Sequence, residues 1–204
     1  MIENDKWVKY KGCATALAFG YHGPTYKLGC TRNRAGYKIY SLAGKKEGWK
    51  RFPIGGGTDL AVDAAGDPWV INANSTVFRW DSIVERWVAM GVKDAHGIAA
   101  GAEGDVYVLA GSGGSGFRIL RWEGAKKWYA MPGMGATTIS IGKFGRPYIT
   151  DHAGNAWWSK CVGPENPLTL TDKNYELLLK NLPKAKLQAV DQEFLNRVII
   201  EPED

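Results

Sequence analysis

A repeat with a period of about 40 residues runs through the first three quarters of the chain and restricts its fold more than any other feature. Each unit has an apolar tetrad, then a glycine followed three residues later by an aromatic residue, then an alternating run that ends near a second aromatic residue. The glycine and aromatic positions are Gly23 and Tyr26, Gly66 and Trp69, Gly104 and Tyr107, and Gly145 and Tyr148. Self-similarity at one fixed period indicates a repeat architecture.

Each unit is predicted to form four short strands. The alternation in residues 77–80 has the period of two that directs one face to a core and the other to water. Glycine in residues 64–67, 102–105 and 143–146 supplies the positive φ that a tight hairpin needs. One small sheet cannot bury its faces alone, so the units are expected to stack radially. The sequence therefore predicts an all-β fold, a small β-propeller of about four four-stranded blades at residues 13–53, 54–91, 92–132 and 133–160.

The fourth unit has no closing tryptophan strand, whereas the chain carries such a strand before its first unit. Residues 5–10, with Trp7 at their centre, have the form of a closing strand. We expect this segment to complete the fourth blade and to close the ring within residues 1–162. The alternative is an open arc of blades that a partner chain completes.

Most tryptophans recur at equivalent positions of the repeat, which favours a structural role between blades over a role in ligand stacking. Trp49, Trp87 and Trp128 each occupy the closing strand of a unit. The predicted structural aromatic residues are Trp7, Trp49, Trp69, Trp80, Trp87, Trp122, Trp128 and Trp158.

Residues 5–160 resemble tectonin repeats, the β-propeller units of tachylectin-type and fish-egg lectins and of intracellular tectonin-domain proteins. The second unit matches best, through residues 59–62, Gly66, residues 69–72, residues 77–80 and Trp87. The resemblance implies a propeller with a recognition role, often toward carbohydrate or toward protein and membrane surfaces, and it does not imply catalysis.

Residues 163–204 differ from the repeat region in composition and in charge. Residues 172–182 place apolar side chains at helical spacing, and a second amphipathic stretch follows, so this extension is expected to be α-helical. It either braces the propeller or docks to another protein as a helix in a groove. Its net charge is −3, which leaves +8 on residues 1–162.

A basic propeller favours anionic partners, such as acidic glycans, lipid head groups or an acidic protein surface. Nucleic acid is not favoured, because no recognised binding module accompanies the charge. Ligand contacts are expected from residues that break the repeat, namely Arg32, Arg34, Asn74, Lys143, Arg146 and His152.

No arrangement of nucleophile, base and orienting group emerges from the sequence, so we predict neither an enzyme nor a cofactor. Asp151 and His152 could form a dyad, but a turn histidine explains the pair more simply. Three widely spaced cysteines, Cys13, Cys30 and Cys161, fit neither a zinc motif nor a disulfide framework. They are predicted to be free thiols.

The charged N-terminal decapeptide has no apolar segment of a secretory signal, and no apolar run could span a membrane. We therefore expect a cytoplasmic protein. Its predicted function is that of a recognition module for carbohydrate or other anionic determinants. The alternative is a scaffold subunit of a larger intracellular assembly, docking through the propeller faces and residues 163–204.

Overall fold

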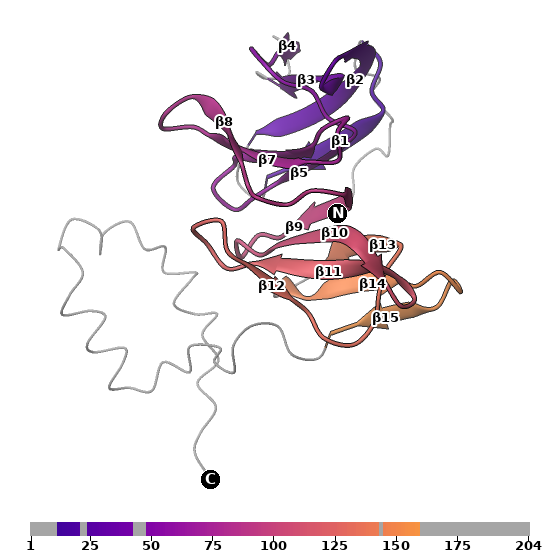
Figure 1. Ribbon diagram of the computed structural model, residues 1–204. Coiled ribbons are helices and arrows are strands. Elements are labelled where there is room, and N and C mark those ends of the chain that lie inside the picture. The colour runs from indigo at the N-terminus through magenta and orange to yellow at the C-terminus, as the bar shows by residue number, and fades with distance from the viewer. Residues whose placement is uncertain (1–11, 21–23, 43–47, 143–144, 160–204) are drawn as a thin grey trace, which may run out of the picture. The chain divides into compact units, whose positions relative to one another are not determined.

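The computed structural model describes residues 12–20, 24–42, 48–142 and 145–159, and all regular structure in these ranges is β-strand (Figure 1). Within the described ranges, fifteen strands form four antiparallel sheets. Each sheet takes its strands consecutively from the chain, so that every strand pairs with its neighbour in sequence. The predicted all-β fold of small antiparallel sheets is confirmed.

We call the four sheets the first to fourth blades. The first contains β1 (Ala16–Phe19), β2 (Thr25–Asn33), β3 (Gly36–Leu42) and β4 (Trp49–Arg51). The second contains β5 (Asp59–Val62), β6 (Pro68–Ile71), β7 (Val77–Asp81) and β8 (Arg86–Ala89). The third contains β9 (Ala95–Ala100), β10 (Val106–Gly113), β11 (Gly116–Trp122) and β12 (Trp128–Ala130). The fourth contains β13 (Thr138–Ile141), β14 (Pro147–Thr150) and β15 (Ala156–Trp158).

The blades pack face to face in chain order, through the first strand of each. Strand β1 contacts β5, β5 contacts β9, and β9 contacts β13. Three apolar clusters fill the three junctions between successive blades. Among the described strands, β1 and β13 make no comparable contact. The predicted closing strand at residues 5–10 and the predicted helices of residues 163–204 lie outside the described residues.

Tight hairpins between the first two strands of a blade depend on the predicted glycines. Gly66, Gly104 and Gly145 have φ angles of +86°, +91° and +65°, a region that favours glycine. In the second blade, the carboxylate of Asp63 accepts the backbone N–H groups of Ala65 and Asp67, both at 3.0 Å. The sequence places an acceptor and a glycine where this turn requires them.

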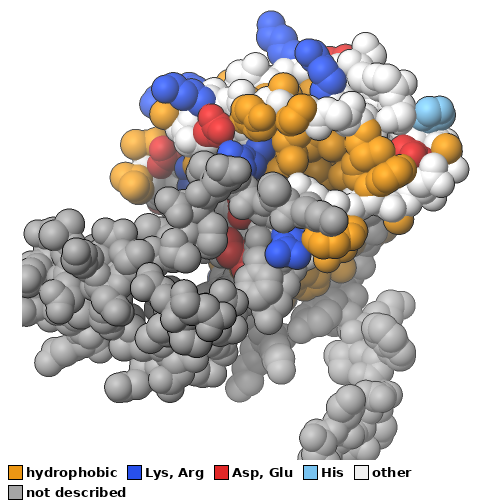
Figure 2. Space-filling model, turned by 90° about the horizontal axis from the view of Figure 1, so that it is seen from below, with side chains coloured by type: hydrophobic (Ala, Val, Ile, Leu, Met, Phe, Trp, Pro, Cys, Tyr) orange, Lys and Arg blue, Asp and Glu red, His pale blue; other side chains and the backbone are white. Residues whose placement is uncertain are grey.

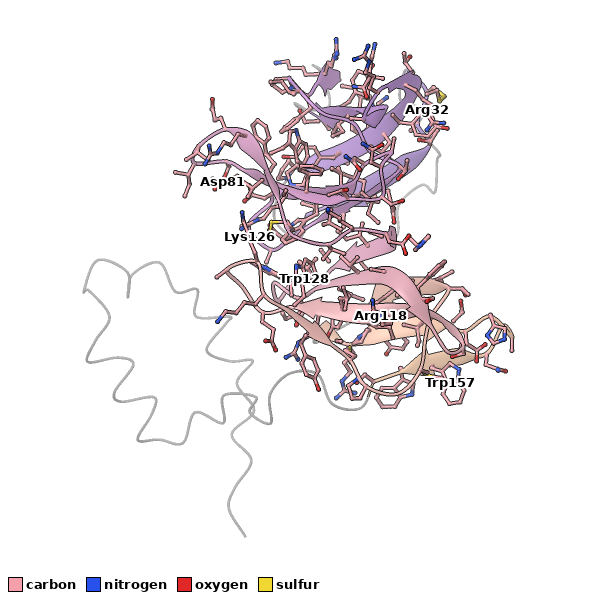
Figure 3. The ribbon with its side chains drawn as sticks, in the orientation of Figure 1. Arg32, Asp81, Arg118, Lys126, Trp128 and Trp157 are labelled. Carbon is pink, nitrogen blue, oxygen red and sulfur yellow. A yellow bond between two sulfur atoms is a disulfide. The ribbon has the colours of Figure 1, made fainter. Side chains whose placement is uncertain are left out.

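Tryptophans on the outer strands connect the second and third blades to the segments that precede them. The indole N–H of Trp87 donates to the carbonyl of Ile54 at 2.7 Å. The indole N–H of Trp128, which is labelled in Figure 3, donates to the carbonyl of Met90 at 2.8 Å. Gly55 permits the first of these contacts, because a Cβ there would lie 2.6 Å from the Trp87 indole nitrogen.

The remaining predicted structural tryptophans divide into buried and exposed groups. Trp69 is fully buried, with ring centroids 5.2 Å from Trp122 and 6.2 Å from Trp128. Trp80 lies 5.5 Å from Trp87. Trp49 packs on Lys27 of its own blade, Trp158 is half exposed, and Trp7 lies outside the described residues.

Cys13 and Cys30 form a disulfide with a Cα–Cα distance of 5.6 Å, so the prediction of free thiols is wrong for this pair. The hydrogen bond from Thr15 N–H to Leu28 O extends the β1–β2 ladder toward the N-terminus and brings the two cysteines together. Disulfides persist mainly in oxidising compartments. Cytoplasmic localisation thus stays a prediction, and the disulfide argues against it.

Replacing both Cys13 and Cys30 by serine is expected to lower the free energy of unfolding by about 3 kcal/mol, because the crosslink closes a loop with a sequence separation of 17 residues. Urea unfolding of the variant and of the wild type, each with and without dithiothreitol, checks this. The reductant should destabilise the wild type alone. Equal midpoints for the oxidised wild type and the variant would contradict a stabilising role.

Candidate functional site

Each blade presents its hairpins at two opposite rims. The second-hairpin rim holds the turns between the second and third strands, and the first-hairpin rim holds those between the first and second strands. At the second-hairpin rim, Ala73 N–H donates to Ala35 O at 2.9 Å and His152 N–H donates to Ser115 O at 3.2 Å. Turns of neighbouring blades therefore adjoin there.

Three predicted ligand residues come together at the second-hairpin rim, where the first and second blades meet. Arg32 is the last residue but one of β2, and its guanidinium lies 4.9 Å from the ring centroid of Tyr37 (Figure 3). Arg34 belongs to the adjoining turn and is exposed. Asn74 lies in the neighbouring turn, next to the Ala73–Ala35 hydrogen bond.

The other predicted ligand residues are not part of this group. His152 lies on the same rim but in the fourth blade, where its Nδ1 is 2.9 Å from the carbonyl oxygen of Ser115. Arg146 lies at the opposite rim, with its guanidinium 5.4 Å from the ring centroid of Trp158. Lys143 is outside the described residues.

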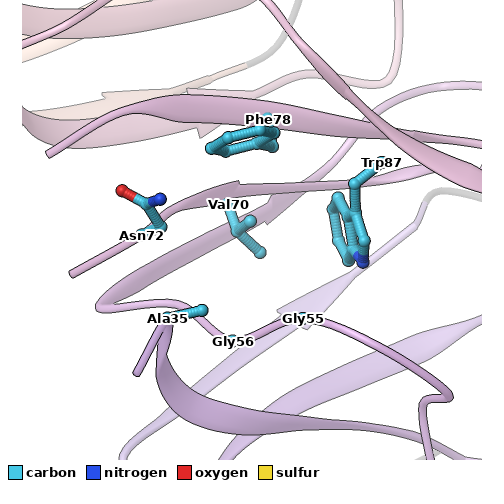
Figure 4. Close-up of a pocket in the computed structure, with 7 residues that line it drawn as sticks. All are labelled: Ala35, Gly55, Gly56, Val70, Asn72, Phe78 and Trp87. Carbon is cyan, nitrogen blue, oxygen red and sulfur yellow. The ribbon is translucent and has the colours of Figure 1, made fainter. Parts of the chain in front are cut away.

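A cavity of about 140 Å³ opens between the first and second blades (Figure 4). Two of its lining residues, Ala35 and Asn72, belong to the turns that carry Arg34 and Asn74. Phe78 and Trp87 are its aromatic lining residues, and Val70 pairs with Phe78 on the neighbouring strand. The complete lining is Ala35, Gly55, Gly56, Val70, Asn72, Phe78 and Trp87. Its surface is thus largely apolar, with one side-chain amide.

Two asparagines set the polar geometry of this cavity. Asn33 donates to the carbonyl of Gly55 at 2.9 Å and accepts the backbone N–H of Ala35 at 2.9 Å, which fixes the cavity mouth. Asn72 Oδ1 accepts the N–H groups of Asn74 and Thr76. Its Nδ2 group donates to no partner among the described residues, so it is a donor available to a ligand.

A second cavity, of about 320 Å³, lies on the first blade and is lined in part by the two disulfide-bonded cysteines. Lys27 is its only charged lining residue among those described; its ammonium lies 4.5 Å from the ring centroid of Trp49 and 5.4 Å from that of Tyr40. Burial lowers the pKa of Lys27. Cation–π contacts compensate part of the desolvation of this ammonium.

Asp151 and His152 do not form a hydrogen-bonded dyad. The Asp151 carboxylate accepts backbone N–H groups of Ala153 and Asn155 and the indole N–H of Trp157. These bonds hold its pKa near 2, with the side-chain amide of Asn155 as the largest cause. A carboxylate engaged in this way orders its turn, whereas His152 contacts Ser115. That the chain is not an enzyme stays a prediction.

The sequence did not reveal the cavity residues as ligand contacts. Trp87 was assigned a structural role, which it has, and its other ring surface forms a cavity wall. Phe78 and Asn72 belong to the regular repeat, whereas the predicted ligand residues are those that break it. The run Gly55–Gly57 is the one local signal, because consecutive glycines permit close approach of two segments.

No protein-family model matches this chain, and no curated protein matches it. Tectonin membership therefore stays a prediction. Among the described residues, no helix has the length and hydropathy needed to cross a membrane.

Solved structures do match, in 34 chains. One is described as YCF48 bound to D1 peptide; it has a TM-score of 0.50 and 13% sequence identity, and the alignment covers 72% of this chain and 50% of that chain. The present chain thus spans half the length of that β-propeller structure. At this identity the likeness concerns the fold alone. The described part of the chain has the β-propeller fold, with four blades of small antiparallel sheets.

Proposed function

We propose that this chain is a non-enzymatic recognition module that binds carbohydrate at the second-hairpin rim between the first and second blades. The observation that carries the proposal is the cavity lined by Phe78, Trp87 and Asn72. The exposed Arg34 immediately precedes its lining residue Ala35 in sequence. Apolar concave sites with a few directed polar groups are the usual form of ligand sites.

The size of the cavity limits what enters it. A cavity of about 140 Å³ is comparable to engineered cavities of roughly 150 Å³ that hold one benzene molecule. It therefore accommodates a single sugar ring or an acyl substituent, and the rest of a glycan would extend over the rim. Aromatic side chains suit the apolar face of a sugar ring, and an amide suits its hydroxyl groups.

The charge at the rim favours an acidic glycan over a neutral one. Arg32 and Arg34 are exposed and lie within three residues of the cavity residue Ala35 in sequence, and residues 1–162 carry a net charge of +8. A guanidinium binds carboxylate or sulfate in a two-pronged geometry that lysine does not provide.

A glycan array screened at physiological and at high salt tests this function, followed by calorimetry with the sugar that binds. Ala35→Leu should abolish binding by filling the cavity. Arg34→Ala should raise the dissociation constant of an acidic sugar about 10–100-fold, the range expected for loss of a hydrogen bond to a charged group. Arg146→Ala, at the opposite rim, is the matched control and should leave binding unchanged.

Two results would contradict the carbohydrate proposal. Binding that disappears at high salt would indicate charge attraction without a site. Binding that survives Ala35→Leu would place the site elsewhere, with the Lys27 cavity as the next candidate.

A scaffold role is the second candidate, supported by the exposed apolar side chains Phe19, Ile83 and Trp158. In that case no sugar binds, and protein partners are captured by the full chain but not by a variant that ends at residue 162. Residues 1–162 form a compact unit separate from 163–204, so this deletion should leave the blades folded.

A further inference from the structure

The first blade exposes a face that each other blade packs against its neighbour. In the second blade, Leu60 and Val62 of β5 pack against the first blade. Their repeat equivalents in β1 are Leu17 and Phe19, and no described blade covers them. Phe19 is 68% exposed, whereas Val62 is 4% exposed. We call Leu17 and Phe19 the first end face.

The fourth blade exposes the opposite face. In the third blade, Tyr107 of β10 is 0% exposed and its hydroxyl donates to Gly145 O of the fourth blade at 3.4 Å. Its repeat equivalent in β14 is Tyr148, which is 45% exposed, beside Trp158 at 49%. Figure 2 looks onto the fourth blade and shows hydrophobic side chains gathered there. We call Tyr148 and Trp158 the second end face.

The two end faces are expected to be complementary, because their repeat equivalents pack against each other between neighbouring blades. Each inner junction of the structure joins a face of the first type to a face of the second type, and the apolar clusters show how well they fit. Because β1 and β13 make no comparable contact among the described strands, the four blades do not bury these faces against each other. Large exposed aromatic side chains grouped on one sheet mark an interaction surface.

We propose that a second copy of this chain covers both end faces, with the first blade of each copy packed against the fourth blade of the other. Such a head-to-tail contact forms a closed ring of two copies when each copy is rotated by half a turn relative to the other. Two copies supply eight blades, within the usual range of about 4–8 for propellers. The alignment of these blades with half of the YCF48 structure agrees with an incomplete ring in one chain. The inference does not depend on the ligand.

The ring has a consequence for recognition. Head-to-tail copies turn the same rim to the same side, so the two second-hairpin rims would face one surface. Two linked sites raise the apparent affinity for a multivalent ligand without any new contact.

Light scattering coupled to size-exclusion chromatography of the full chain, over a range of concentrations, tests the proposal. The wild type should have twice the 22.4 kDa mass of one chain. Phe19→Glu and Tyr148→Glu should each raise the dissociation constant about thirtyfold or more, as expected for a buried aromatic anchor. Ile83→Glu is the matched control, because Ile83 is exposed but lies on neither end face.

Mixing the two variants distinguishes a head-to-tail contact from a symmetric one. Phe19→Glu retains an intact second end face and Tyr148→Glu an intact first end face, so their mixture should recover a dimer that neither forms alone. No recovery would overturn the head-to-tail arrangement. A wild type that stays monomeric at every concentration would overturn the proposal, and would mean that another part of the chain or another protein covers the end faces. Circular dichroism of each variant verifies that it is folded.

Discussion

Trp69→Ala is expected to lower the free energy of unfolding by about 3–5 kcal/mol, the range for removing a large aromatic side chain from a packed core. The ring is 0% exposed and fills the junction between the second and third blades against Trp122 and Trp128. Domains of this size are stable by only about 5–15 kcal/mol. The variant should therefore retain only a small part of the wild-type free energy of unfolding.

Trp157→Ala is the control that separates burial from hydrogen bonding. Trp69 donates to Asp63 at 2.9 Å and Trp157 donates to Asp151 at 3.0 Å, so both variants lose the same type of bond. Because Trp157 is 45% exposed, its loss should cost only about 1–2 kcal/mol. Urea unfolding at one fixed protein concentration measures both changes. Equal losses would mean that the hydrogen bond, and not the packing, dominates at Trp69.

The repeat predicts the fold, but it does not predict which equivalent residues are buried. Glycines such as Gly66 and Gly104 mark hairpins because positive φ is a local property that one residue reveals. Tyr107 and Tyr148 occupy equivalent positions in the repeat, yet Tyr107 is buried and Tyr148 is exposed. Their difference depends on whether a blade follows, and that is a property of the assembly.

For a related reason, the sequence pattern predicts neither the disulfide nor the cavity. The pairing of Cys13 with Cys30 follows only from the register of β1 and β2, which sets residues far apart in sequence opposite each other. The cavity depends on how far two blades separate at one rim, and no single strand encodes that distance. The sequence predicts Arg34 and Asn74 as ligand residues because they depart from the repeat. It does not predict Phe78 and Trp87, because they match the repeat.

Arg79 makes a further strong contribution that the sequence does not show, since it looks like an ordinary outward residue of an alternating strand. Its guanidinium lies 3.0 Å from Asp63 and 2.9 Å from Asp67, two carboxylates that are almost wholly buried. It also lies over the rings of Trp69 and Trp122. Burial raises the pKa of Asp67, and the Ser82 hydroxyl and Arg79 oppose that rise.

Arg79→Met should cost about 3–5 kcal/mol at pH 7, because it leaves buried charge without its partner. Without Arg79 the pKa of Asp67 rises further in the folded state, so the folded state binds a proton more tightly than the unfolded state does. Stability of the variant then falls as the pH rises through that pKa. The difference in free energy of unfolding between the wild type and the variant should therefore become smaller as the pH falls toward about 3.9, the ordinary pKa of aspartate. Thermal unfolding over this pH range measures the trend.

Two companion variants decide whether charge or packing causes the loss. Asp67→Asn in the Arg79→Met background removes one unpaired charge and should recover part of the stability at pH 7. If the apolar stem of Arg79 against Trp69 were the main contribution, this second change would recover nothing and the deficit would not vary with pH. Glu123→Gln, which breaks the exposed pair with Arg121 at 3.2 Å, should change stability by less than about 1 kcal/mol. The contrast between these two ion pairs would show that burial of the carboxylates, and not the number of ion pairs, gives Arg79 its effect at the junction of the second and third blades.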